Sequence, residues 1–182
     1  MRRAALVLAA VLSSGCLVVS LQPAYDDKTV AFDEALLGKW SDAEDQLQAT
    51  IERGEWRSYR ITYVDHSTTK TFQGNLTKIG PAQYLDLTES RGEDPGPFLI
   101  PVHGLYRLEI NGNTLTAAPL DYGWFTRAMQ QKALAHLNVS FDDRRNAVIA
   151  APTADLRRWL AKPPAGAEVF AAPMTFERVT AP

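Results

Sequence analysis

The chain has 182 residues, of which 46% are hydrophobic and 22% are charged, a composition typical of one globular domain. Its formal net charge of -2 excludes the basic surface expected of a nucleic-acid-binding protein. The single cysteine, Cys16, excludes an internal disulfide and a cysteine metal site.

The first 15 residues have the three parts of a secretory signal. Arg2 and Arg3 precede an apolar run over residues 4–12, and three small residues then lead to Cys16. The run is too short and too broken for a transmembrane helix, which needs about 20 apolar residues. The sequence therefore predicts a cleaved export signal and a mature protein outside the cytoplasm.

Small residues directly before a lone cysteine resemble the lipobox of bacterial lipoproteins. Ser13 stands where that family prefers leucine, and Leu12 lies one place earlier. The resemblance implies that residues 1–15 are removed and that Cys16 is lipidated, which anchors the protein in the cell envelope. Leu17 after the cysteine resembles the outer-membrane sorting signal of enteric bacteria, which implies an outer-membrane protein facing the periplasm. The alternative is a plain thiol after cleavage nearby.

Residues 16–37 are expected to be the lipidated cysteine and a tether, because residues 17–30 mix apolar and charged side chains without a period. A short helix is predicted over residues 32–37, ended by Gly38. Loss of the signal removes two arginines and lowers the formal net charge from -2 to -4. Lipid rather than charge would therefore hold the protein at an anionic membrane.

Residues 38–182 are predicted to form the folded domain, in which short segments alternate apolar and polar side chains, the period of a half-buried strand. In residues 56–64, for example, Tyr59, Ile61 and Tyr63 share one face. Further strands are predicted over residues 71–79, 83–88, 102–110, 114–118, 146–151 and 169–179, with a tight turn at Asn111-Gly112.

Two late segments have helical spacing instead. Asp121 is the candidate N-cap of the first, and Thr153 that of the second, which Pro163-Pro164 ends. Eight or nine antiparallel strands with two short late helices favour an up-and-down barrel, because closure removes the exposed edges of the sheet. A two-sheet sandwich is the alternative.

Residues at the two ends of this domain carry a second resemblance. Gly38-Lys39-Trp40 resembles the Gly-x-Trp motif that opens lipocalins and related calycin barrels, and Arg178 is placed like the arginine that crosses that tryptophan. The resemblance implies a lipocalin-like barrel closed at one end by Trp40, with Arg178 on its ring. The two late helices depart from that family, which has its main helix before a short final strand. The chain also resembles small bacterial lipoproteins of unknown activity with a phrase such as Tyr84-Leu85-Asp86-Leu87.

The candidate ligand-binding residues are His103, Arg107, Tyr84 and Tyr106. His103 and Arg107 share a strand face with Glu109. Inside a barrel this face would suit an anionic head group, and outside it would be a solvated stripe, which we favour. The three histidines lack the spacing of a helical metal site, and no set of acid, base and nucleophile can be assembled. We therefore expect no cofactor, no metal and no enzymatic activity.

These features leave two alternative functions. The first is a lipid-anchored envelope protein that binds a small apolar or amphipathic ligand in its barrel. The second is a structural lipoprotein with a packed barrel that docks onto another envelope protein, using Trp124, Phe125 and Trp159 if they are exposed. A large apolar cavity in the barrel favours the first alternative, and a packed interior favours the second.

Overall fold

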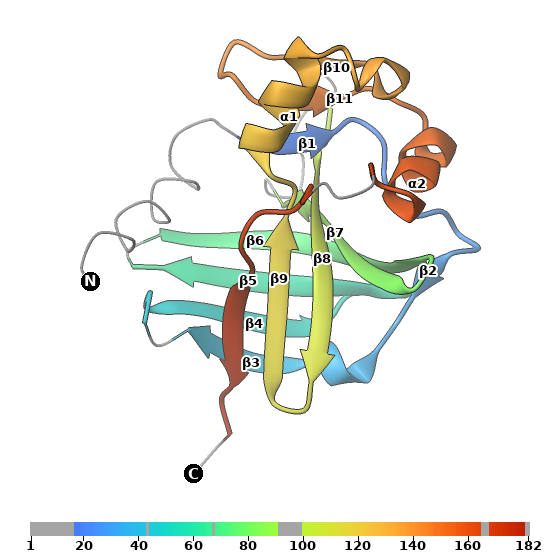
Figure 1. Ribbon diagram of the computed structural model, residues 1–182. Coiled ribbons are helices and arrows are strands. Elements are labelled where there is room, and N and C mark those ends of the chain that lie inside the picture. The colour runs from blue at the N-terminus through green and yellow to red at the C-terminus, as the bar shows by residue number, and fades with distance from the viewer. Residues whose placement is uncertain (1–16, 43, 67, 91–99, 165–167, 181–182) are drawn as a thin grey trace.

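Eight antiparallel strands close into a barrel in the computed structural model, which describes residues 17–42, 44–66, 68–90, 100–164 and 168–180 (Figure 1). Consecutive strands pair around the barrel, and the last strand lies between the first strand and the β8–β9 hairpin. This closure confirms the predicted barrel and excludes the sandwich. The barrel strands are β3 (Gly38–Asp42), β4 (Leu47–Arg53), β5 (Ser58–Asp65), β6 (Thr68–Ile79), β7 (Ala82–Glu89), β8 (His103–Asn111), β9 (Thr114–Pro119) and β12 (Met174–Arg178).

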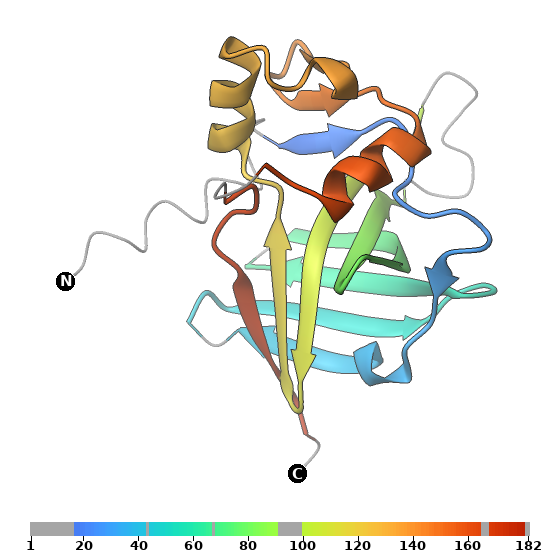
Figure 2. The same cartoon turned by 45° about the vertical axis from the view of Figure 1, so that its right-hand side comes forward.

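A second layer of short elements, here named the cap, lies across one end of the barrel (Figure 2). Its strand β1 pairs with β8 on one side and, in parallel, with β11 on the other, so β1 joins the cap to the barrel. The cap consists of β1 (Val18–Ser20), α1 (Tyr122–Gln130), η2 (Ala135–Leu137), β10 (Val139–Phe141), β11 (Ala147–Ile149) and α2 (Thr153–Ala161).

Both predicted helices are present between β9 and β12. Asp121 caps α1 as predicted, because its side chain accepts a hydrogen bond from the amide of Trp124. Helix α2 differs in one detail: Pro152 occupies the N-cap position, so Thr153 is the first helical residue and does not cap the helix. The fixed φ of proline suits this position just before a helix, where no amide hydrogen is needed.

The segment before the barrel, expected to be a tether, is packed against the domain from Leu17 onward. It contains β1, β2 (Val30–Ala31) and the 3-10 turn η1 (Glu34–Leu36), and β2 pairs with β6. Its buried side chains are Val18, Ser20, Ala24, Val30 and Leu36. These residues lack a regular period because they pack one at a time: Val18 and Ala24 join the core beneath the cap, and Leu36 joins the barrel core. Residues 17–37 are therefore part of the folded structure.

Trp40 closes the end of the barrel opposite the cap. Its side chain is 0% exposed, and its indole nitrogen donates to the carbonyl of Leu36 at 2.9 Å. The Arg178 guanidinium carbon lies 4.1 Å from the centre of the Trp40 ring, as the sequence leads us to expect. The guanidinium also donates to the carbonyls of Leu37 at 2.7 Å and Ala35 at 2.6 Å. The pair thus joins the first and last strands of the barrel to η1.

The apolar side chains form two separate cores. The first lies inside the barrel and includes Trp40, Ile51, Tyr59, Ile61, Leu76, Leu85, Leu108 and Phe176. The second lies between the cap and the outer face of β7, β8 and β9, and includes Tyr84, Leu105, Phe125, Leu137, Ile149, Leu156, Trp159 and Phe170. Since β7 and β8 contribute to both cores, they are covered on both faces.

The aromatic residues that the docking alternative requires lie in the second core. Phe125 is 0% exposed and Trp159 is 5% exposed. Their rings lie 5.6 Å apart, and both contact the partly buried ring of Trp124. The helices therefore use these three side chains to hold the cap together, and the side chains do not form an exposed docking surface.

Candidate ligand-binding site

The barrel is hollow at the end that faces the cap. A mostly apolar cavity of about 570 Å³ lies there, between β1, the start of α1 and the ends of the barrel strands. Its apolar lining includes Leu17, Val18, Leu47, Tyr106, Leu120 and Met174. This space stays open because the small residues Gly104, Ala171 and Ala172 line it. At the closed end of the barrel, by contrast, the large side chains of Trp40 and Phe176 fill the interior.

One residue of the cavity lining carries a buried hydroxyl without a partner. The Tyr63 hydroxyl is buried and makes no hydrogen bond with any described residue. Burial raises the pKa of Tyr63, and the negative charges of Asp65 and Asp45 raise this pKa further. An unsatisfied buried hydroxyl costs about 1–3 kcal/mol, so this group lowers the stability of the cavity wall.

The charged part of the cavity lining is acidic. Four acidic residues line the cavity: Glu44, Asp45, Asp65 and Asp121. No Lys or Arg occurs among the described residues that line the cavity. His66 also lines the cavity, and its Nδ1 lies 3.5 Å from a carboxylate oxygen of Asp65. The start of α1 also borders the cavity, but the Asp121 carboxylate caps it and offsets the partial positive charge of the helix end.

Of the four candidate ligand-binding residues, Tyr106 lines the cavity and the other three lie on the outer face of the barrel. Burial raises the pKa of the Tyr106 hydroxyl. Tyr84 packs on Phe170 in the second core, and its hydroxyl lies 3.4 Å from the Leu160 carbonyl. The Arg107 guanidinium carbon lies over the same Phe170 ring, 4.5 Å from its centre.

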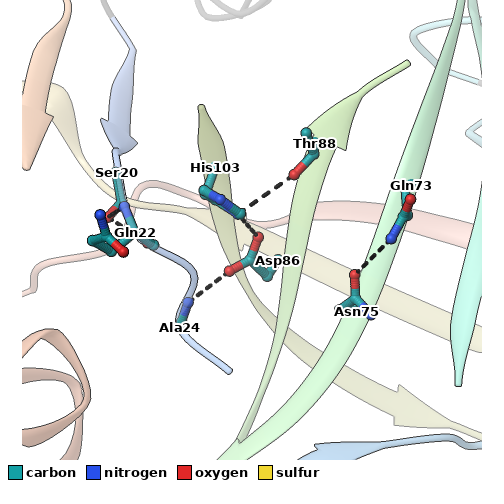
Figure 3. A network of polar contacts seen from close by, with 8 residues as sticks. All are labelled: Ser20, Gln22, Ala24, Gln73, Asn75, Asp86, Thr88 and His103. Carbon is teal, nitrogen blue, oxygen red and sulfur yellow. Dashed lines mark hydrogen bonds and ion pairs between the residues drawn. The ribbon is translucent and has the colours of Figure 1, made fainter. Parts of the chain in front are cut away.

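His103 lies on the outer face, as we favour from the sequence, but the expected solvated stripe is wrong at this residue. His103 is only 8% exposed, and its Nδ1 lies 2.6 Å from the carboxylate of Asp86, which is 1% exposed (Figure 3). The other Asp86 oxygen accepts from the amide of Ala24 at 2.7 Å. The packed segment before the barrel covers both side chains, and its Ala24 amide is hydrogen-bonded to Asp86.

Ser20 is the register partner of His103, so the fold brings a serine, a histidine and an aspartate together (Figure 3). The hydrogen bonds of the Ser20 hydroxyl go to Gln22 and not to His103. The hydroxyl donates to the Gln22 carbonyl at 2.7 Å and accepts from the Gln22 amide at 3.2 Å. A nucleophilic triad needs the hydroxyl bonded to the imidazole. The contact between Asp86 and His103 therefore has a structural role: it supports the bond from Asp86 to the segment around Ala24.

Sequence reasoning missed most of this site. Residues 17–19, Asp45, Asp65 and Tyr63 line the cavity, yet none of them belongs to a motif. The period-two pattern does place Tyr63 on the inner face with Tyr59 and Ile61, so its position in the barrel could be inferred. The closeness of residues 17–19 to the mouth depends on long-range pairing that no local pattern reveals.

Within the described ranges, no group of three or more His, Cys, Asp or Glu side chains is placed to hold a metal ion. In the same residues, every helix is too short or too polar to cross a bilayer. No family model, no curated protein and no solved structure matches the chain. The closed eight-stranded barrel is compatible with a lipocalin-like fold.

Proposed function

We propose that the protein is a lipid-anchored lipoprotein of the bacterial cell envelope whose lipocalin-like barrel binds a small apolar or amphipathic ligand. The cavity of about 570 Å³ carries this proposal. Pockets for small ligands measure about 300–1,000 Å³ and combine apolar walls with a few polar groups. The lipobox-like residues before Cys16, which lie outside the described residues, support the anchor, and Leu17 supports the outer membrane facing the periplasm.

The alternative, a structural lipoprotein with a solid barrel, has less support. Its interior would be filled with side chains, and its helices would expose Trp124, Phe125 and Trp159. The cavity speaks against the first requirement, and the burial of Phe125 and Trp159 speaks against the second.

A substitution that fills the cavity tests ligand binding. A Cβ at Gly104 would lie 3.5 Å from the Tyr106 ring, an ordinary contact, so a larger side chain there extends into the cavity. We expect Gly104→Phe to weaken binding of the apolar fluorophore N-phenyl-1-naphthylamine by about tenfold or more, the effect of losing roughly 1.4 kcal/mol of contact. Fluorescence titration measures the affinity, and circular dichroism checks the fold.

Glu109→Phe is the matched control, because it adds the same ring on the same strand at an exposed position of the outer face. It should bind the fluorophore like the unsubstituted protein. Equal binding by both variants, or no binding by the unsubstituted protein, would contradict the proposal. The anchor is tested separately: Cys16→Ser should abolish incorporation of an alkyne-tagged palmitate and release the protein from the membrane fraction.

A further inference from the structure

Leu17, the first residue that the structure describes, lines the cavity. Its backbone is fixed on both sides, because its amide donates to the Asn146 side chain at 3.1 Å and its carbonyl accepts from the Ala147 amide at 2.8 Å. The Cα atoms of adjacent residues lie about 3.8 Å apart, so the point at which the preceding segment attaches is fixed beside the cavity.

We infer that the cavity faces the membrane and is loaded from it with an amphiphile that has an apolar tail and a cationic head. This inference rests on the proposed function, since it requires the lipid on Cys16 and a binding cavity. No free linker separates the expected anchor from the rim: the residue after the cysteine is already held by β11. A short attachment of this kind restricts the distance between the mouth and the bilayer surface.

The tail is matched to the walls of the cavity. The lining includes five apolar or aromatic side chains, those of Leu17, Val18, Leu47, Tyr106 and Met174. An acyl chain that moves from a bilayer into this space exchanges one apolar environment for another, without crossing water. The route matters because transfer of each exposed methylene into water costs about 0.8 kcal/mol.

The charge of the head follows from the carboxylates at the mouth. Glu44, Asp45 and Asp65 line it, whereas none of its described lining residues is Lys or Arg. An anionic head would approach like charges in a partly desolvated site, and a cationic head would be attracted to them.

Photo-crosslinking in membranes tests this inference. The lipidated full-chain product, purified from cell membranes, is reconstituted into phosphatidylcholine vesicles that contain a hexadecyl probe with a diazirine in its tail. Three probes differ only in the head, which is an amine, an alcohol or a carboxylate. We expect the amine probe to label peptides that contain Tyr106 or Met174 about tenfold more than the carboxylate probe does, with less difference in high salt.

Two variants identify the origin of the preference. Asp45→Asn combined with Asp65→Asn should remove most of the difference between the amine and carboxylate probes. Glu52→Gln combined with Asp143→Asn removes the same charge from exposed positions away from the cavity and should leave the preference unchanged. Gly104→Phe should abolish labelling of the cavity by all three probes.

The outcomes separate this inference from the proposed function. Equal labelling by the three probes, or stronger labelling by the carboxylate, overturns the cationic head and leaves ligand binding intact. Absence of cavity labelling from vesicles, in a protein that still binds N-phenyl-1-naphthylamine, overturns loading from the membrane. Absence of both labelling and fluorophore binding overturns the proposed function as well.

Discussion

At the scale of single residues, the Tyr63 hydroxyl lowers stability. It has no partner among the described residues, so Tyr63→Phe removes an unsatisfied group without leaving a cavity of its own. We expect the free energy of unfolding to rise by up to about 1 kcal/mol. The affinity for the hexadecylamine probe should change by less than about twofold, because the buried hydroxyl is not exposed to the cavity.

Urea unfolding and probe titration measure the two effects on the same preparation. Tyr84→Phe is the control, since its hydroxyl has the Leu160 carbonyl as a neighbour and lies outside the cavity. This control should be slightly less stable than the unsubstituted protein and should bind the probe unchanged. A loss of stability in Tyr63→Phe, or a large loss of affinity, would contradict the buried and unsatisfied state of this hydroxyl.

The same tyrosines predict the behaviour of the protein at alkaline pH. Burial raises the folded-state pKa of Tyr63 and Tyr106 above the ordinary value of 10.0. Above pH 10 the unfolded chain therefore loses these protons while the folded protein retains them, and stability falls as the pH rises. Below pH 10 this contribution is fully present. Urea midpoints at pH 8 and pH 11 should differ less in Tyr63→Phe than in the unsubstituted protein.

At the scale of elements, the start of β3 depends on a glycine. Gly38 has a φ of +128°, and a Cβ there would lie 2.8 Å from the guanidinium of Arg178. We expect Gly38→Ala to lower the free energy of unfolding by about 2–3 kcal/mol, because backbone strain and displacement of Arg178 from Trp40 add together. Gly80 has a φ of +60°, and a Cβ there would meet no atom within 4 Å. Gly80→Ala should therefore lower the free energy of unfolding by only about 1–2 kcal/mol. Equal losses in the two variants, measured by urea unfolding, would refute the special role of Gly38.

At the scale of the whole molecule, β8 connects all the parts. It pairs with β7 and β9 in the barrel and with β1 in the cap, and its two faces lie in the two cores. Hydrogen exchange should therefore be slowest for the amides of residues 104–108, which open only when both parts unfold. Faster exchange there than in β4, which pairs only with its two barrel neighbours, would show that the cap and barrel unfold independently.

The barrel could be predicted from the sequence, and the cavity could not. Alternation over long strands such as β5 and β6 is a local property, and the Trp40–Arg178 pair follows from a motif at the two ends of the domain. Strands β1 and β2 have only 3 and 2 residues, too few to show a period. Asp86 and His103 look like outward polar residues because their cover comes from the segment around Ala24, far away in the chain. The cavity depends on where side chains are small and on which distant segments meet there.

The parallel pairing of β1 with β11 also affects the order in which parts of the chain fold. Leu17 bonds to Asn146 and Ala147, so the earliest described residues can pair only when residues 146 and 147 are available to fold. An enzyme that cuts before Cys16 or modifies its sulfur must hold the neighbouring residues in its own active site. Since the folded domain fixes Leu17, the proposed lipidation of Cys16 would have to precede completion of the cap. The delay imposed by this long-range pairing would then keep the proposed processing site accessible.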